Sequence, residues 1–249
     1  NRMEDVENFW KTGILDPQSN VQFGEGGAGT FSDGKLNSAV KDPSGRNQFV
    51  LETFVKFGAP EQILYDNKPH IGTDILSKVI VRMRKYLEEK GCQFFFECCA
   101  KDFIIESGSI RQIVCDKKTF DVQTVVLALG HSSRDTFEKL SARNISMEVK
   151  NFAVGFRVEH PQSMIDRAMY GTDRFHGLPA SPYKVTSNFP NGRGVYSFCM
   201  CPGGYVVNSS SEKEETVVNG MSYSGRNGQN ANSAIIVSVT PADFGASDP

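Results

Sequence analysis

Glycine density is the feature that most constrains this chain, and it peaks over residues 24–36, which read GEGGAGTFSDGKL. Four glycines fall within six positions, followed by a turn-forming segment and a single lysine. Glycines this dense let a backbone approach another molecule closely and point several N–H groups at it. Since Phe31, Asp33, Lys35 and Leu36 are not typical of a linker, this glycine strip indicates a phosphate or cofactor cradle, with a plain surface loop as the alternative.

The glycine strip satisfies the dinucleotide-binding pattern G-x-G-x-x-G through Gly24, Gly26 and Gly29. That pattern indicates a Rossmann fold only where it follows a buried strand, opens a helix and precedes an acidic residue about 20 positions on. Here residues 19–23 alternate polar and apolar, a turn signal follows the last glycine, and Glu52 lies within a helical pattern. The residues therefore argue against a Rossmann loop at this point.

A P-loop is a second reading of the same strip, because Gly29, Gly34 and Lys35 give G-x-x-x-x-G-K. The next residue is Leu36, so the Ser or Thr hydroxyl that ligates Mg²⁺ is missing, and no apolar strand precedes the loop. A P-loop-like NTPase is only a remote alternative.

A second segment, residues 122–134, reads VQTVVLALGHSSR and predicts a buried strand over 124–129 that ends at Gly130 and His131. Together with the glycine strip it resembles a family of uncharacterised FAD-dependent dehydrogenases, within the glutathione-reductase-like and hydroxybenzoate-hydroxylase-like flavoproteins. Further segments that match lie at 56–74, 151–162, 192–207 and 219–239. The resemblance covers nearly the whole chain.

This resemblance implies an α/β class, α+β overall. A partial, Rossmann-like FAD/NAD(P)-binding domain is expected over 1–150, with 40–72 as an insertion near the substrate lobe, and an antiparallel-rich substrate domain over 151–249. The resembling proteins carry a Rossmann βαβ unit upstream and a Gly-Asp segment downstream, so we expect this chain to be an internal fragment of a longer flavoprotein. The implied cofactor is FAD, with NAD(P)H as electron donor and a small molecule of unknown identity as substrate.

The resemblance also implies a set of cofactor contacts. Lys35 would neutralise the pyrophosphate or the flavin N1–C2 locus, although a solvated lysine is the alternative. His131 lies where open α/β sheets place their ligands, and the main chain near Ala100 would meet the adenine. The full expected set is Gly24, Glu25, Gly26, Gly27, Ala28, Gly29, Thr30, Phe31, Ser32, Asp33, Lys35, Ala100, Gly130 and His131.

Cysteine placement gives the candidate catalytic residues. Six cysteines in a chain of this size do not make a disulfide framework, so small buried thiols in a reducing compartment are expected. On a strand, Cys199 and Cys201 would put both thiols on one face, roughly 6 to 7 Å apart at Cα. Catalytic thiols, structural packing and a metal site are the alternatives, and zinc lacks its further ligands. The candidates, with no metal expected, are His131, Cys199 and Cys201, followed by Arg157, His160 and His176 without rank.

Composition and charge narrow the classes of function. With 39% hydrophobic and 22% charged residues, the 249-residue chain is typical of a soluble globular protein. A net charge of −2 gives no reason to expect nucleic acid or an anionic membrane as partner. No apolar run approaches the roughly 20 residues of a spanning helix, so a cytoplasmic location is expected, with the oligomeric state left open.

Periodic patterns predict the surrounding elements. Helices are expected over 4–11, 47–57, 74–90 and 134–143. Strands in the first part of the chain are expected over 92–98, 102–106, 110–115 and 124–129, with a hairpin turn at 107–108. Later β patterns lie at 152–159, 183–187, 194–200, 204–208, 216–220 and 234–239.

Two functions from different classes fit these observations. The first is an FAD-dependent oxidoreductase of unknown substrate, to which this chain contributes part of the flavin site and the substrate domain. The second is a non-catalytic or degenerate nucleotide-binding fragment without bound flavin. The features that discriminate between them are an upstream G-x-G-x-x-G after a strand and a downstream Gly-Asp motif, neither of which occurs in residues 1–249. The isolated chain is therefore expected to be inactive.

Overall fold

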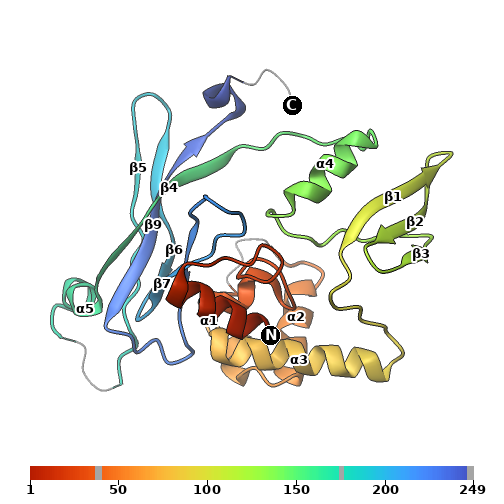
Figure 1. The fold of residues 1–249 in the computed structure, drawn as a ribbon. Coiled ribbons are helices and arrows are strands. Elements are labelled where there is room, and N and C mark those ends of the chain that lie inside the picture. Colours follow the sequence, from red (N-terminus) through yellow and green to blue (C-terminus); the bar gives the residue numbers. More distant parts are fainter. Residues whose placement is uncertain (37–40, 174–176, 246–249) are drawn as a thin grey trace. The chain divides into compact units, whose positions relative to one another are not determined.

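The computed structural model describes residues 1–36, 41–173 and 177–245 (Figure 1). These residues form a mixed α+β arrangement in which all pairings between the named strands are antiparallel. They divide into two compact units, residues 1–86 with 151–245, and residues 87–150. The coarse α+β class is confirmed, whereas the Rossmann-like domain and the expected domain boundary at residue 150 stay predictions.

Helices are few and short apart from one. The α-helices are α1 (Arg2–Thr12), α2 (Arg46–Lys56), α3 (Thr73–Glu89), α4 (Arg134–Ala142) and α5 (Gln162–Tyr170). Short 3-10 turns are η1 (Gly27–Phe31), η2 (Glu61–Leu64) and η3 (Pro241–Phe244). The four helices that the sequence predicts are confirmed to within two residues at each end, whereas α5 was not predicted.

The strands form three separate antiparallel sheets. The first sheet contains β1 (Ala100–Glu106), β2 (Ser109–Cys115) and β3 (Thr119–Asp121). The second has the order β4-β9-β6-β5, with bounds Phe152–Pro161, Asn230–Val239, Gly194–Cys201 and Thr186–Asn188. The third pairs β7 (Tyr205–Asn208) with β8 (Val218–Met221).

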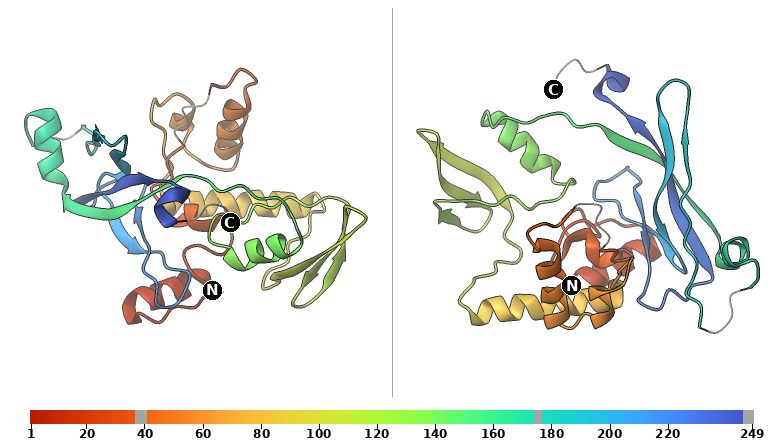
Figure 2. Two further views of the ribbon diagram at one scale, coloured as in Figure 1. Left: turned by 90° about the horizontal axis from the view of Figure 1, so that it is seen from above. Right: turned by 180° about the vertical axis from the view of Figure 1, so that it is seen from behind.

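The central pair of the second sheet is β4 with β9. Their register runs without interruption from Phe152 opposite Val239 to Pro161 opposite Asn230, and α5 packs at one end of this pair (Figure 2). On the other side of β9, the pairing with β6 is regular up to Phe198 and then shifts before Cys201. A β-bulge of this kind bends a strand and re-aims its side chains.

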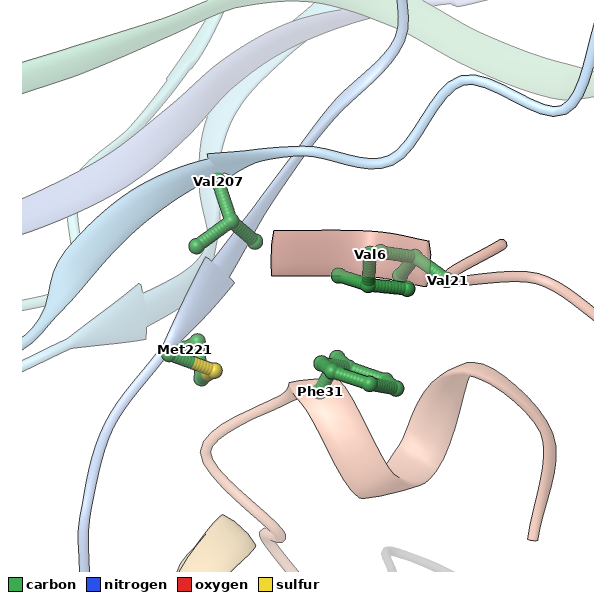
Figure 3. Close-up of a cluster of buried hydrophobic side chains, with 5 residues drawn as sticks. All are labelled: Val6, Val21, Phe31, Val207 and Met221. Atoms are coloured by element: carbon green, nitrogen blue, oxygen red, sulfur yellow. The ribbon is translucent and has the colours of Figure 1, made fainter. Parts of the chain in front are cut away.

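The first hydrophobic core of the larger unit joins the N-terminal segment to β7 and β8. It contains Val6 of α1, Val21, Phe31 of η1, Val207 of β7 and Met221 of β8, all less than 10% exposed (Figure 3). Burial of this apolar surface fixes the glycine strip against the C-terminal strands.

A second core surrounds the longest helix, α3. Val79 on its inner face is fully buried and packs with Ala59, Ile63 and Ile71 from the segment that precedes the helix. The apolar stripe of α3 repeats at helical spacing, which is why the sequence predicts this element with nearly correct bounds.

Two of the strands expected in the unit of residues 87–150 are absent from the structure of that unit. Its β1–β2 hairpin turns at Ser107 and Gly108 as predicted, and both have positive φ. By contrast, residues 92–98 and 124–129 are not strands, and Val126 is 84% exposed. In the described part of the chain neither segment has a neighbouring strand to receive its hydrogen bonds, and apolar composition alone does not make a strand.

Phe31 offers a test of the first core. Phe31→Ala is expected to lower the free energy of unfolding by about 3 to 4 kcal/mol, because a buried aromatic side chain is replaced by a cavity. Urea denaturation measures the change. The matched control is Phe156→Ala on β4, where the side chain is 85% exposed and a loss below about 1 kcal/mol is expected. Equal losses at the two positions would contradict this account of the core.

Candidate functional site

The centre of the candidate site is the carboxylate of Asp33, which is 1% exposed. Ser222 Oγ donates to Asp33 Oδ1 at 2.5 Å, and Arg226 Nε donates to the same oxygen at 3.0 Å. Arg226 Nη2 donates to Oδ2, which also lies 2.9 Å from Lys35 Nζ. Two cations and a hydroxyl thus surround one buried carboxylate.

These contacts decide the protonation state of Asp33. Burial by itself raises the pKa of the carboxyl group, but the hydrogen bond from Arg226 and the charges of Lys35 and Arg226 outweigh it. The pKa of Asp33 consequently falls to about 2. The carboxylate is therefore an anion that orders its neighbours, and not a proton donor near neutral pH.

A second connection holds the same loop against the start of α3. Asp74 accepts hydrogen bonds from the backbone N–H and the hydroxyl of Ser224, both at 2.8 Å. Gly72 has φ +82°, and a Cβ there would overlap the Ser224 backbone. His70 Nε2 donates to the Ser224 carbonyl at 3.2 Å, while burial and the charge of Arg226 lower the pKa of its imidazole. The approach of the two segments therefore requires glycine at position 72.

The guanidinium of Arg2 organises the start of the glycine strip. It donates to the carbonyls of Asn20 and Glu25 at 2.8 Å, of Val21 at 2.6 Å and of Gly27 at 2.9 Å. Since C=O and N–H of a peptide unit point in opposite directions, carbonyls turned toward Arg2 direct the N–H groups of the following residues away from it.

The four clustered glycines fall into two kinds. A Cβ at Gly24 would overlap the Arg2 side chain, and one at Gly26 would overlap the Thr30 methyl group. At Gly27 and Gly29, by contrast, nothing lies within 4 Å of a Cβ position. The first pair serves the packing of the chain itself, whereas the second pair presents an open face that another molecule can approach.

Several expected cofactor contacts have structural roles in the strip. Glu25 pairs with Arg84, at 2.6 Å between Oε1 and Nε, and the Thr30 carbonyl accepts a hydrogen bond from Thr73. Phe31 lies in the core, and Ser32 Oγ donates to the Gly29 carbonyl at 2.7 Å. Ala28 is half-buried within η1. Whether any of these residues contacts a cofactor stays a prediction.

Three expected cofactor residues lie in the other compact unit. Ala100 begins β1 opposite Cys115, and Gly130 has φ +70° with open space around it. The exposed His131 lies with Nδ1 3.1 Å from Ser132 Oγ. Because the strand that should precede His131 is not formed, the argument that placed it at the end of a parallel strand is wrong.

The candidate thiols lie beside the Asp33 carboxylate. Lys35 Nζ is 3.9 Å from Cys201 Sγ, and Arg157 Nη1 donates to the Cys199 carbonyl at 3.2 Å and to Asn232 Oδ1 at 2.7 Å. His160 packs its ring against Tyr183. The remaining unranked candidate, His176, lies outside the described residues.

Sequence reasoning missed the residues that complete this cluster. Ser222 and Arg226 belong to the segment 219–239, which resembles the flavoprotein family but contributed no expected site residue. No motif in the sequence pointed to Arg2. The Ser-Gly-Arg turn signal marks a loop at 224–226, but only the fold shows that this loop lies over a buried carboxylate.

The part of the chain that the structure describes offers no cluster of three or more His, Cys, Asp or Glu side chains that could hold a metal ion. Nor does this part contain a helix whose length and apolar character would let it cross a membrane.

Comparison with known proteins bears on the C-terminal part of the chain. Residues 151–249 match the family described as "FAD-dependent protein, C-terminal domain-like". This match supports an FAD-dependent family. A protein of Clostridium beijerinckii, named only as uncharacterised, is 48% identical over 250 residues, which cover 100% of this chain and 46% of that protein. The chain thus spans about half the length of this curated relative.

The Asp33 cluster gives a test of stability. Asp33→Asn is expected to lower the free energy of unfolding at pH 7 by about 3 kcal/mol, because the buried charges of Arg226 and Lys35 lose their counterion. Since the pKa of Asp33 is depressed from 3.8 to about 2, its contribution is complete above pH 4 and lost as pH falls toward 2. Urea denaturation across this range should therefore show the difference between wild type and variant shrinking.

The matched control is Asp173→Asn, which removes the partner of Arg167 in an exposed ion pair. Solvent screens such a pair, so a much smaller change is expected. A pH-independent loss in Asp33→Asn would contradict an electrostatic role for this carboxylate.

Proposed function

We propose that this chain is part of an FAD-dependent oxidoreductase, in which the glycine strip approaches the flavin cofactor. The observation that carries the proposal is the match of residues 151–249 to an FAD-dependent family, on a chain whose strip keeps an open face at Gly27 and Gly29. The C-terminal strands pack directly on the strip through the first core and the Asp33 cluster. The matched segment and the open glycines therefore belong to one folded unit.

The residues of the strip fit a phosphate or a ring edge. At Gly27 and Gly29 no side chain obstructs the approach, and the N–H groups of Gly26 and Ala28 point away from Arg2. Lys35, at the end of the strip, adds a cation that is paired with Asp33. When bound, FAD supplies the electron-transfer chemistry, and the protein binds and orients it.

The finer assignments belong to the same proposal. The reaction is that of a dehydrogenase with NAD(P)H as electron donor, acting in the cytoplasm on a small molecule that contacts residues 151–249. Nucleic acid and membranes are not partners. The competing function is a nucleotide-binding fragment without flavin. The colour of the purified product of the complete gene distinguishes the two: yellow protein favours the oxidoreductase, and colourless protein favours the fragment without flavin.

Gly29 is the position that tests cofactor approach most cleanly. It is exposed, its φ is not left-handed, and a Cβ there meets nothing within 4 Å. In the complete gene product, Gly29→Leu should therefore leave the apo fold intact and lose most of the bound FAD, because the added side chain fills the space that the cofactor needs. Flavin absorbance per polypeptide measures the loss.

Gly29→Ala is the matched control, and it should lose less FAD because its side chain is smaller. Thermal unfolding of the apo proteins checks that both variants fold as well as the wild type. Full FAD occupancy in Gly29→Leu would remove the strip from the flavin site.

A further test concerns residues 1–249 alone. The strip follows no strand and opens the short 3-10 turn η1 in place of an α-helix, so the described residues hold no Rossmann site for the pyrophosphate. Losing three or four charge-assisted contacts, at roughly 1.5 to 3 kcal/mol each, takes a nanomolar site to the millimolar range. We expect the isolated chain to bind FAD no tighter than about 100 μM, measured by flavin fluorescence. Low-micromolar affinity would show that the strip is a self-sufficient dinucleotide site.

A further inference from the structure

The end of β6 brings two thiols together at an irregular point of the backbone. The β6–β9 register shifts between Phe198 and Cys201, and Cys199 has φ +47°. In a regular strand the side chains of residues i and i+2 stand apart on one face. Here the bulge breaks that alternation, and Cys201 Sγ turns back to donate to the Cys199 carbonyl oxygen at 3.4 Å, which brings the thiol of Cys201 beside Cys199.

The backbone of Cys199 is held in a conformation that a non-glycine residue rarely adopts. Arg157 fixes it, because Nη1 binds both the Cys199 carbonyl and Asn232 Oδ1. Strained backbone of this kind persists only where its surroundings determine it, and it gathers at functional sites. Two cysteines that only filled space in the core would not require it.

Positive charge surrounds the two sulfur atoms. Lys35 Nζ lies 3.9 Å from Cys201 Sγ, and Arg157 has no carboxylate partner among the described residues. The negative charge of Asp33 opposes this effect, but Asp33 is already paired with Lys35 and Arg226. A cationic environment stabilises a thiolate relative to a thiol.

The two thiols are unequal. The hydrogen bond from Cys201, with the charges of Lys35 and Arg157, outweighs burial and lowers the pKa of Cys199 to about 6. The same hydrogen bond and burial raise the pKa of Cys201. Cys199 is half-buried and Cys201 has no exposed surface. One thiol is thus an accessible anion at neutral pH, and its neighbour is a protected, protonated thiol.

We propose that Cys199 and Cys201 form a redox-active dithiol that exchanges with small disulfides. The Cys199 thiolate attacks one sulfur of the disulfide, which forms a mixed disulfide and releases the first substrate thiolate. Cys201 loses its proton to that departing thiolate and attacks the sulfur of Cys199. The second substrate thiolate leaves, the protein holds a Cys199–Cys201 disulfide, and the substrate disulfide is reduced to one thiol and one thiolate.

The proposal is independent of flavin binding, and its test needs no FAD. The complete gene product is reduced, equilibrated with mixtures of reduced and oxidised glutathione at pH 7, alkylated and digested with trypsin. Cleavage after Arg193 and Lys213 gives a peptide, 194–213, that contains Cys199 and Cys201 and no other cysteine. With rising oxidised glutathione this peptide should change from the doubly alkylated form to an unalkylated form that is lighter by two hydrogen atoms than the dithiol.

Single variants assign the roles. Cys201→Ser should accumulate a glutathione adduct at Cys199, because the resolving thiol is gone, whereas Cys199→Ser should form little adduct at the buried Cys201. The internal control is peptide 112–117, whose only cysteine is Cys115; burial and then a hydrogen bond with Cys98 raise the pKa of that thiol to about 11, so it should carry no glutathione. A wild-type peptide that stays doubly alkylated at every glutathione ratio would overturn the proposal, as would equal adducts in both variants.

A pH profile separates thiolate chemistry from simple exposure. The rate of alkylation of Cys199 is measured as a function of pH, and in the wild type its midpoint should lie near pH 6. The variant Cys201→Ala reports the same midpoint without the hydrogen-bond donor. The charged groups that face the sulfur are Lys35, Arg157 and Asp33. Removing the donor should move the midpoint upward, and Lys35→Gln should do so as well, whereas Lys35→Arg should restore it. A midpoint that none of these substitutions moves would show that the site does not activate Cys199.

Discussion

A single buried carboxylate, Asp33, fixes how the two ends of the described chain meet. An unpaired anion at this depth would be prohibitively unstable, so the glycine strip keeps its shape only where Arg226, Lys35 and Ser222 surround Asp33. Ser222 and Arg226 lie 189 and 193 positions along the chain from it. The strip is therefore not a local motif, because its conformation depends on the segment between β8 and β9, far along the chain.

The same carboxylate positions the charges that the site presents. Lys35 is held between Asp33 and the sulfur of Cys201, so the glycine strip and the bulge of β6 share one electrostatic environment. Together with Arg226 and Arg157, this environment contains three cations against one carboxylate. Such an excess favours anions, whether a phosphate, an electron-rich ring edge or a thiolate.

The sequence pattern predicted those helices and turns that are stabilised by contacts between residues close together in the chain. The apolar stripe of α3 and the turn at 107–108 need only their own residues, and both are confirmed. The segment 124–129 shows the limit, since a strand needs a neighbour and composition does not supply one. The contacts of the candidate site show the same limit. Asp33 and Lys35 stood out within their motif, whereas Arg226 acquires its meaning only from contact across the fold.

The glycine pattern itself shows why spacing alone is a weak guide to a dinucleotide site. Arg2 and Thr30 occupy the space that a side chain would need at Gly24 and Gly26, whereas nothing lies within 4 Å of a Cβ position at Gly29. The formal G-x-G-x-x-G therefore combines glycines that serve internal packing with one that leaves a surface open. In a true Rossmann loop the three glycines make the tight turn, admit the pyrophosphate and let the helix pack closely on the strand. In this chain the glycine spacing accompanies the packing of Arg2 and Thr30, and the open positions of the strip are Gly27 and Gly29.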